Sequence, residues 1–231
     1  MKKKIVAFAM VFALAAVAVV GGSLAYFTDT ETADNSFTVG NVSIELIEQE
    51  KQYKEGTDEY ELVEFTNNKV LMPGMQNAVD KIVTVKNTGD NAAYVRVKIT
   101  VPAALKDVIH LNQEINTQWS ELTSSSDDEG NLVYTAIYNK ALAGKSVVDD
   151  ETVYDVSEVV LSSIYLDSTV NYDEDGYYFV KTVEGDTGAM EVRENIDLDP
   201  QSVVVNVVAE AIQADGFGSA KDAFDAYDAQ K

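Results

Sequence analysis

Short runs in which apolar and polar residues alternate recur along this chain, and turn-forming residues separate them. The pattern is clearest in residues 83–86 and 95–101, where valine or isoleucine occupies every second position. Side chains at every second position lie on one face of a β-strand, so each run predicts a strand with one buried face. The sequence Asn87-Thr88-Gly89-Asp90 lies between the two runs and predicts a turn that joins them as a hairpin.

Weaker runs complete the fold prediction. They predict strands around residues 42–46, 60–66, 159–170 and 177–183, and a central strand over 202–212. A hairpin is expected over 119–138, with a polar tip at 124–131, and a type II turn at Pro73-Gly74. Helical structure is expected as one or two turns within 103–112 and as a helix over 219–227. We expect loops over 48–59 and 140–157, and a polar insertion over 184–199. About nine short antiparallel strands predict an all-β fold, a jelly-roll or Ig-like β-sandwich with a short C-terminal helix.

The first residues predict an export signal. Lys2, Lys3 and Lys4 precede an uncharged apolar run of 16 residues, Ile5–Val20, which is short for a spanning helix of about 20 residues. Small residues at Ser23 and Ala25 suit a signal peptidase, so we expect cleavage before Tyr26. The alternative is an uncleaved membrane anchor.

The expected cleavage removes residues 1–25, the signal peptide, which we expect to be helical, and leaves a chain with two parts. The first part, residues 26–36, is a polar, threonine-rich and acidic arm that we expect to be extended and flexible. The β-sandwich domain then covers residues 37–231.

Composition excludes some classes of function. The chain has no cysteine, so its stability comes from a packed core without disulfides. Its net charge is −22, and removing the three signal lysines makes this −25. Such a charge repels nucleic acid and anionic lipid headgroups, so we expect no nucleic-acid partner and no stable membrane insertion after cleavage.

Several segments resemble one known family. The opening runs Gly21-Gly22-Ser-Leu-Ala-Tyr-Phe-Thr-Asp and Asn35-Ser-Phe-Thr-Val-Gly40, the pair Leu71-Met-Pro-Gly74 and Val83-Thr-Val-Lys-Asn-Thr-Gly89, and the closing Ala209-Glu-Ala-Ile-Gln-Ala-Asp-Gly216 are similar to the exported TasA/camelysin family of Gram-positive bacteria. Residues 107–199 show no such similarity.

The resemblance implies both a fold and a role. It implies a jelly roll, processing by a SipW-type signal peptidase, and self-association into extracellular fibres of the biofilm matrix. In this family the mature N-terminal segment can be donated as a strand to the next subunit's sheet. The candidate anchors of such a donor arm are Tyr26, Phe27 and Phe37.

The resemblance also raises metal-dependent peptidase activity, since some members are classified as camelysin metallo-endopeptidases. His110 is the only histidine, and the sequence contains neither cysteine nor a His-Glu-x-x-His motif. A three-ligand zinc site would therefore need an unusual excess of carboxylates. We expect His110 to be a hydrogen-bonded structural residue.

Two acidic turns are candidates for calcium. In the first, Asn171, Asp173 and Asp175 precede Gly176 and reproduce the first half of a calcium loop, but Thr182 stands where a bidentate glutamate belongs. The second, Asp127–Asn131, lacks this spacing. We expect both to be hairpin tips, with calcium as the alternative for the first, and we expect no other cofactor.

The sequence favours a secreted, non-catalytic structural or surface protein, a component of an extracellular matrix that assembles by N-terminal strand donation. Two alternatives remain open: a camelysin-like secreted metallo-endopeptidase, and a monomeric cell-surface binding module.

Overall fold

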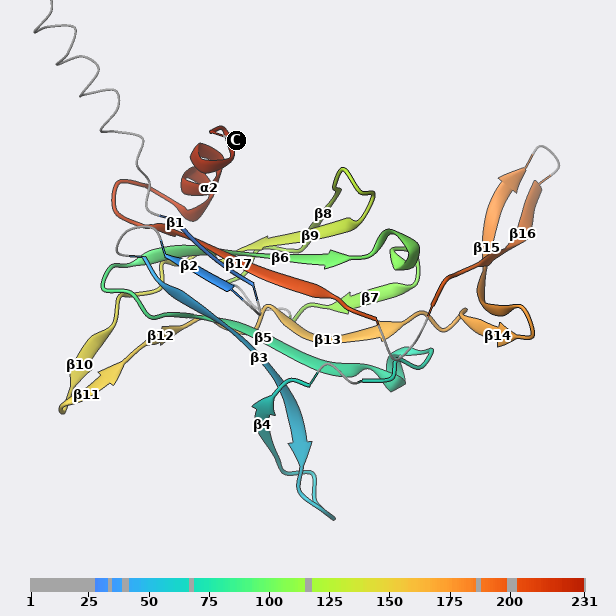
Figure 1. The fold of residues 1–231 in the computed structure, drawn as a ribbon, viewed down its shortest axis with the longest axis horizontal. Coiled ribbons are helices and arrows are strands. Elements are labelled where there is room, and N and C mark those ends of the chain that lie inside the picture. The colour runs from blue at the N-terminus through green and yellow to red at the C-terminus, as the bar shows by residue number, and fades with distance from the viewer. Residues whose placement is uncertain are drawn as a thin grey trace, which may run out of the picture.

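The computed structural model describes residues 28–32, 35–38, 42–66, 69–114, 118–185, 188–198 and 203–230. Within these residues the fold is a sandwich of two six-stranded antiparallel sheets with one α-helix near the C-terminus (Figure 1). The predicted fold class, an antiparallel β-sandwich with a short C-terminal helix, is confirmed. The predicted signal peptide, including Ser23, Ala25 and the expected cleavage before Tyr26, lies outside the described residues.

The first sheet, sheet A, contains the strand that the apolar run 202–212 predicts as central. Its strand order is β2-β1-β17-β6-β9-β8. The bounds are β2 (Asn35–Thr38), β1 (Thr28–Thr32), β17 (Asn206–Gln213), β6 (Ala93–Val101), β9 (Leu132–Ile137) and β8 (Thr123–Ser126). The predicted hairpin over 119–138 is present as β8 and β9, and Trp119 bridges to Tyr138 beyond β8.

The second sheet, sheet B, lies against sheet A across the core (Figure 1). Its strand order is β4-β3-β5-β13-β7, and β12 also pairs with β5. The bounds are β4 (Tyr60–Glu64), β3 (Ile44–Tyr53), β5 (Val79–Asn87), β13 (Leu161–Leu166), β7 (Ile109–Asn112) and β12 (Asp155–Val156), with 3-10 turns η1 (Met75–Asn77) and η2 (Ala103–Leu105).

Valines that alternate along β5 and β6 meet in one core. Val83 and Val85 of β5 and Val95 and Val97 of β6 are completely buried in the same apolar cluster. The two strands belong to different sheets, so the predicted hairpin between them is wrong: the connection crosses from sheet B to sheet A.

Asn87 fixes this crossing. Its buried side-chain amide donates hydrogen bonds to the carbonyl oxygens of Asn91 (2.9 Å) and Leu142 (3.0 Å), and its Oδ1 accepts one from the Gly89 N–H (2.9 Å). An alternating pattern shows that a strand has a face toward the core, but it does not show which strand pairs with it. The pattern in β5 and β6 is therefore compatible with a hairpin and with a connection between sheets.

Three segments that we expect to be loops contain strands. Residues 48–53 continue β3, residues 146–156 contain β10 (Ser146–Val148), β11 (Glu151–Val153) and β12, and residues 188–195 form β16 (Gly188–Asn195). Beside β16 lie β15 (Gly176–Gly185) and β14 (Asn171–Asp173). The ends of β3 and β4, the pair β10–β11 and the pair β15–β16 project from the sandwich (Figure 1). Side chains in β10, β11 and most of β16 are exposed, so these strands have no buried face to reveal them.

The chain near Pro73-Gly74 differs from the predicted type II turn. Gly74 has the positive φ that such a turn requires, 99°, but its ψ of 142° is far from the value near 0°. The chain then enters η1, and Gly74 donates its N–H to the Leu166 carbonyl (2.8 Å).

The only α-helix of the described residues, α2 (Ala220–Asp228), packs on the outer face of sheet A. Ser219 caps it by accepting a hydrogen bond from the Asp222 N–H (3.1 Å). Ala223 and Phe224 are buried in a small cluster with Ile212 of β17. The helix predicted over 219–227 therefore covers part of the central strand.

Candidate assembly edge and the predicted site residues

The edge of β17 that faces away from β6 is occupied by the chain's own N-terminal segment. β1 pairs antiparallel with β17 at five consecutive positions, from Thr28 opposite Ile212 to Thr32 opposite Val208. β2 then folds back on β1, with Asn35 opposite Thr32 and Thr38 opposite Asp29. The predicted arm 26–36 thus contains β1 and the start of β2.

The three predicted anchors of the arm are placed differently. Phe37 lies in β2, where its Cα is opposite that of Thr30. Tyr26 and Phe27 lie outside the described residues. The structure therefore describes one of the three anchors, Phe37, and places it in β2, with β1 between it and β17.

Two strands flank β17 in sheet A. It pairs with β6 along its whole length, from Asn206 to Gln213, and among the described residues its other edge pairs with β1 from Ile212 to Val208. That edge of β17 therefore takes a segment of the same chain.

A shallow recess lies beside the segment that leads into β17. Burial alternates through the segment that leads into β17: Val205 and Val207 are buried, Val203 is half-buried, and Val204 is 65% exposed. This alternation is that of an extended strand with one face toward the core. The lining of the recess is polar and apolar in about equal parts and consists of Phe65, Lys69, Leu71, Val79, Lys81, Ile164 and Val203–Val205.

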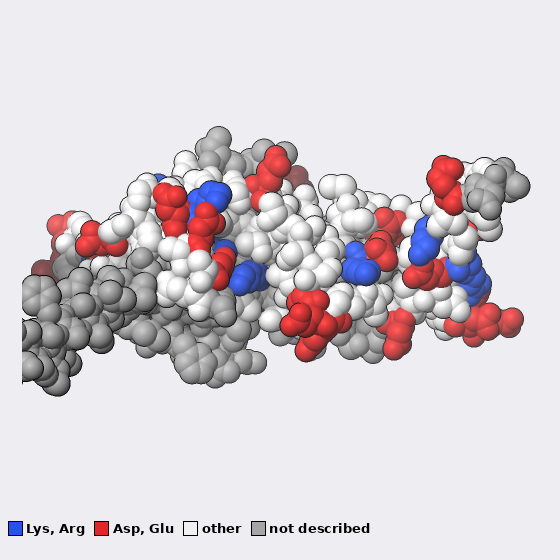
Figure 2. All heavy atoms as spheres, turned by 90° about the horizontal axis from the view of Figure 1, so that it is seen from above, with Lys and Arg blue, Asp and Glu red and all other residues white. Residues whose placement is uncertain are grey.

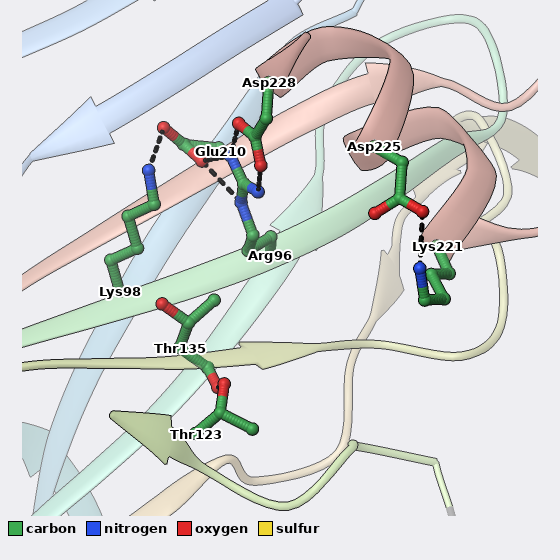
Figure 3. A network of polar contacts seen from close by, with 8 residues as sticks. All are labelled: Arg96, Lys98, Thr123, Thr135, Glu210, Lys221, Asp225 and Asp228. Atoms are coloured by element: carbon green, nitrogen blue, oxygen red, sulfur yellow. Dashed lines mark hydrogen bonds and ion pairs between the residues drawn. The ribbon is translucent and has the colours of Figure 1, made fainter. Parts of the chain in front are cut away.

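On the outer face of sheet A, a group of charged side chains joins β6, β17 and α2 (Figure 3). Arg96 of β6 is 4% exposed. Its Nε donates to Oε2 of Glu210 in β17 (2.6 Å), and its two terminal nitrogens donate to the carboxylate of Asp228 in α2 (2.6 and 3.0 Å). Lys98 Nζ donates to the second carboxylate oxygen of Glu210 (2.9 Å). The guanidinium also lies over the Phe224 ring, 4.4 Å from its centroid.

These contacts determine the ionisation of Glu210. Burial raises the pKa of its carboxyl, but the charge of Arg96 and the hydrogen bond from Lys98 outweigh burial, so the pKa lies below its ordinary value. Burial likewise lowers the pKa of Arg96, and the carboxylates of Asp228 and Glu210 raise it to above its ordinary value. Both groups remain charged at neutral pH.

Sequence reasoning missed this group, although a signal was present. Glu210 is the only charged residue in the apolar run 203–212, and Arg96 and Lys98 are the only charged residues in the run 95–101. A charge within a buried strand requires an opposite partner, so these three residues could have been matched.

The calcium candidates of the first acidic turn lie at the β14–β15 hairpin. Asp173 accepts hydrogen bonds from two guanidinium nitrogens of Arg193 in β16 (2.6 and 3.0 Å) and from the Asp175 N–H (3.0 Å). The hydrogen bond from Arg193 is the main reason that the pKa of Asp173 is lowered. Asn171 donates its side-chain amide to the Thr169 carbonyl (2.8 Å). A guanidinium thus occupies the carboxylate that a calcium ion would need.

The second acidic turn is a hairpin tip between β8 and β9. Asp127 accepts hydrogen bonds from the Asn131 side chain (3.0 Å), the Asn131 N–H (2.9 Å) and the Glu129 N–H (3.0 Å). The bond from the Asn131 side chain is the largest of the effects that lower the pKa of Asp127. Gly130 has a φ of 82° at the tip.

His110 contacts a carboxylate and a ring. Its Nε2 is 2.7 Å from Oδ2 of Asp167, and its ring stacks on Tyr165 with a centroid distance of 5.0 Å. Asp167 also accepts hydrogen bonds from the N–H and hydroxyl of Thr169 (2.8 and 2.7 Å). No group of three or more histidine, aspartate or glutamate side chains in the described part of the chain could hold a metal ion. The described residues therefore do not fit a conventional catalytic zinc centre.

The surface is acidic along its length. Figure 2 shows carboxylates spread over one face, with lysines and arginines beside them. Several lysines of the described chain are paired with carboxylates, as in Lys69 with Glu50 (2.8 Å) and Lys145 with Asp90 (3.2 Å). As to membrane crossing, no helix among the described residues combines sufficient length with sufficient apolar character.

Comparison with known proteins gives one match. Residues 1–98 match the model of the family described as camelysin metallo-endopeptidase. The matched range begins with the predicted export signal and ends within β6. It confirms the resemblance to the TasA/camelysin family. Neither the curated proteins nor the solved structures include a match to this chain at the level of similarity required.

Proposed function

We propose, from the camelysin-family match of residues 1–98, that the mature chain is a secreted, non-catalytic structural subunit of an extracellular matrix. A SipW-type signal peptidase releases it, and it joins other copies by placing its N-terminal strand on the β17 edge of the next subunit. The product is a fibre of identical subunits joined head to tail.

The single observation that carries this proposal is the pairing of β1 with β17. An unpaired strand edge presents a row of N–H and C=O groups that a second chain can satisfy. Here five register positions show that this edge accepts this segment. A second copy's arm has the same backbone and side chains and fits the same edge.

Mass action decides between the two arrangements. Five strand pairs contribute on the order of 5 kcal/mol, at about 1 kcal/mol for each net hydrogen bond. The subunit's own arm makes the same bonds and is held nearby by a short connection, so its effective concentration is in the millimolar range. We therefore expect monomers in dilute solution and fibres at high protein concentration.

Deletion of the arm tests the proposal. The mature chain from Tyr26 and a chain from Phe37 are concentrated side by side and examined by negative-stain electron microscopy and sedimentation. We expect fibres only from the longer chain. The fluorescence of Trp119, the only tryptophan and a buried one, shows whether the shorter chain is folded. Fibres from a folded chain without residues 26–36 would contradict the proposal.

A point variant provides a matched control. Thr30 lies in the middle of β1, and proline at this position lacks the N–H and fits poorly within a strand that pairs on both sides. Thr30→Pro should abolish assembly, whereas Thr30→Val keeps the backbone donor and strand preference and should assemble. Equal assembly of the two variants would count against strand donation.

The family description favours a second candidate, a secreted metallo-endopeptidase. Its test is hydrolysis of casein by the mature chain, with and without a chelator, and by the His110→Ala variant. Hydrolysis that the chelator abolishes and that His110→Ala lacks would favour the peptidase. If the mature chain neither assembles nor hydrolyses casein, the remaining candidate is a monomeric surface-binding module.

A further inference from the structure

The strand β16 has one edge that no described strand covers. It pairs with β15 along its whole length, from Gly188 opposite Gly185 to Asn195 opposite Tyr178, and among the described residues β15 is its only partner strand. The β15–β16 pair projects from the sandwich (Figure 1), so the free edge is open to another molecule. Such an edge presents backbone N–H and C=O groups that a further strand can satisfy.

We infer that two copies of this chain pair through this edge, β16 against β16, in an antiparallel and symmetric contact centred on Val192. The partner is a second copy, and the contact uses neither the N-terminal arm nor β17. The inference therefore goes beyond the proposed function and does not depend on it. A twofold contact of this kind joins two subunits and then closes.

The hairpin has a physical reason to take a further strand. β14 pairs only with the first residues of β15, 176–178, so the rest of the β15–β16 pair is two-stranded. A two-stranded hairpin is marginally stable in water, whereas three or more strands support one another. Pairing through β16 converts two such hairpins into one four-stranded sheet.

Backbone geometry limits the registers of this contact. The Ile196 N–H donates to the Tyr177 carbonyl (2.9 Å), so the backbone groups of Ile196 point toward β15. These groups alternate between the two edges of a strand, so the even-numbered residues of β16 face β15 and the odd-numbered residues face the free edge. Odd-numbered residues of one copy must therefore lie opposite odd-numbered residues of the other. This requires a twofold axis that passes through a residue and not between two residues.

Charge selects one of the registers that remain. With Val192 at the centre, Glu191 lies opposite Arg193 of the second copy, and symmetry produces this pair twice. A centre at Glu191 would place two carboxylates opposite each other, and a centre at Arg193 two guanidinium groups. Like charges directly opposite destabilise a strand pair, whereas opposite charges stabilise it. Centres nearer either end of β16 leave fewer residues paired.

The side chain of Arg193 has room for a second carboxylate. Its guanidinium donates to Asn195 Oδ1 (3.0 Å) and to the two carboxylate oxygens of Asp173 (2.6 and 3.0 Å), which leaves one N–H on each terminal nitrogen for a further acceptor. The Tyr178 ring, whose centroid is 3.8 Å from the guanidinium carbon, also holds it in place. Glu191 is exposed on the same strand and forms no ion pair with a described residue.

Disulfide trapping tests the register. Val192 faces β15 with its backbone groups, so it would form a non-hydrogen-bonded pair with its own copy, at a Cα separation of about 4.5 Å that a disulfide spans. The chain has no cysteine. Oxidation of the mature chain carrying Val192→Cys should therefore give a covalent dimer on a non-reducing gel.

Met190→Cys is the matched control for this disulfide. Met190 lies on the same face of the same strand and is 55% exposed, but in the inferred register it meets Glu194 of the second copy, so this variant should stay monomeric. A Val192→Cys chain that stays monomeric, or equal crosslinking of the two variants, would overturn the inference.

Charge reversal tests the pairing without a crosslink. Glu191→Arg replaces two attractive cross-strand pairs by two repulsive ones and should weaken dimerisation, measured by sedimentation of the mature chain, by about tenfold or more. Glu191→Gln, which only removes the charge, should weaken it less. Mixing Glu191→Arg with Arg193→Glu brings opposite charges together again at both positions and should restore the dimer. Unchanged dimerisation of Glu191→Arg, or a mixture no better than either variant alone, would contradict the inference.

Thr30→Pro separates this contact from strand donation. This substitution should abolish assembly through the arm and leaves β16 unchanged, so Val192→Cys should form its disulfide equally well in the Thr30→Pro chain. Loss of the disulfide in that chain would show that the copies meet only through the arm, and the inference would be wrong. A disulfide in both chains, without fibres from the mature chain, would refute the proposed function and leave this inference supported.

Discussion

Replacing Arg96 by methionine should destabilise the sandwich by about 3 kcal/mol. Breaking a buried ion pair by removing one partner costs about 3–5 kcal/mol, because the other charge stays buried without its partner. Here the charge left behind is Glu210, which is 7% exposed. Lys98 still contacts it, and the side chain of Asp228 is half exposed to water, so we expect the lower end of that range. Methionine keeps the length of the side chain and limits any cavity.

Urea unfolding of the mature chain, followed by Trp119 fluorescence, measures this loss. Removing both charges in Arg96→Met/Glu210→Gln leaves no unpaired buried charge, so the double variant should be more stable than the sum of the two single losses predicts by about 1 kcal/mol or more. A loss below about 1 kcal/mol for Arg96→Met, which is typical of a surface change, would refute this reasoning. Additive losses would refute it as well.

The ion pairs of Glu210 with Arg96 and Lys98 also predict how the stability of the folded chain changes with pH. The pKa of Glu210 is lower in the folded chain than its ordinary value, because Arg96 and Lys98 outweigh the effect of burial. Its contribution to stability is therefore fully present above the unfolded pKa of about 4.3 and is lost as the pH falls through the folded pKa. The stability difference between the mature chain and Glu210→Gln should shrink in acid. A difference that grows on acidification would contradict the assignment.

Three further predictions concern single positions. Gly144→Ala should cost more than about 2 kcal/mol in urea unfolding, because a Cβ there would lie 2.1 Å from the backbone oxygen of Asp90, whereas Gly218→Ala, whose nearest contact is at 3.6 Å, should be nearly neutral. Ser219→Ala removes the cap of α2 and should cost about 1 kcal/mol, measured in the same way; no change would show that the cap is dispensable. Calcium should raise the melting temperature no more than sodium at equal ionic strength, because an arginine already binds Asp173; a calcium-specific rise would contradict this.

The alternation of apolar and polar residues predicted which segments form strands better than it predicted which strands pair. Val83, Val85, Val95 and Val97 are as buried as the pattern requires, but the same pattern describes a hairpin within one sheet and a connection between two sheets. Asn87 favours the connection between sheets, and one of its side-chain hydrogen bonds is to Leu142, a residue far along the chain. Such contacts between distant residues are not visible in a local pattern.

The candidate site was only partly predictable for a related reason. The segment that forms β1, residues 28–32, contains only threonine, aspartate and glutamate. It therefore has no alternation of apolar and polar residues that could have predicted a strand or its partner β17. The family resemblance indicated that the arm is a donor. It could not indicate that the arm occupies its own subunit's edge.

The cis pairing of β1 has a kinetic consequence. In the proposed assembly, a subunit whose β17 edge is already paired with its own arm accepts a neighbour only after that arm has left, so the rate of arm release would limit how fast two monomers first combine. Growth should then begin after a lag that short preformed fragments remove, because a fragment with an open terminal edge needs no such release at the accepting side. The export machinery would in this way deliver subunits that stay separate during transit and polymerise only where they accumulate.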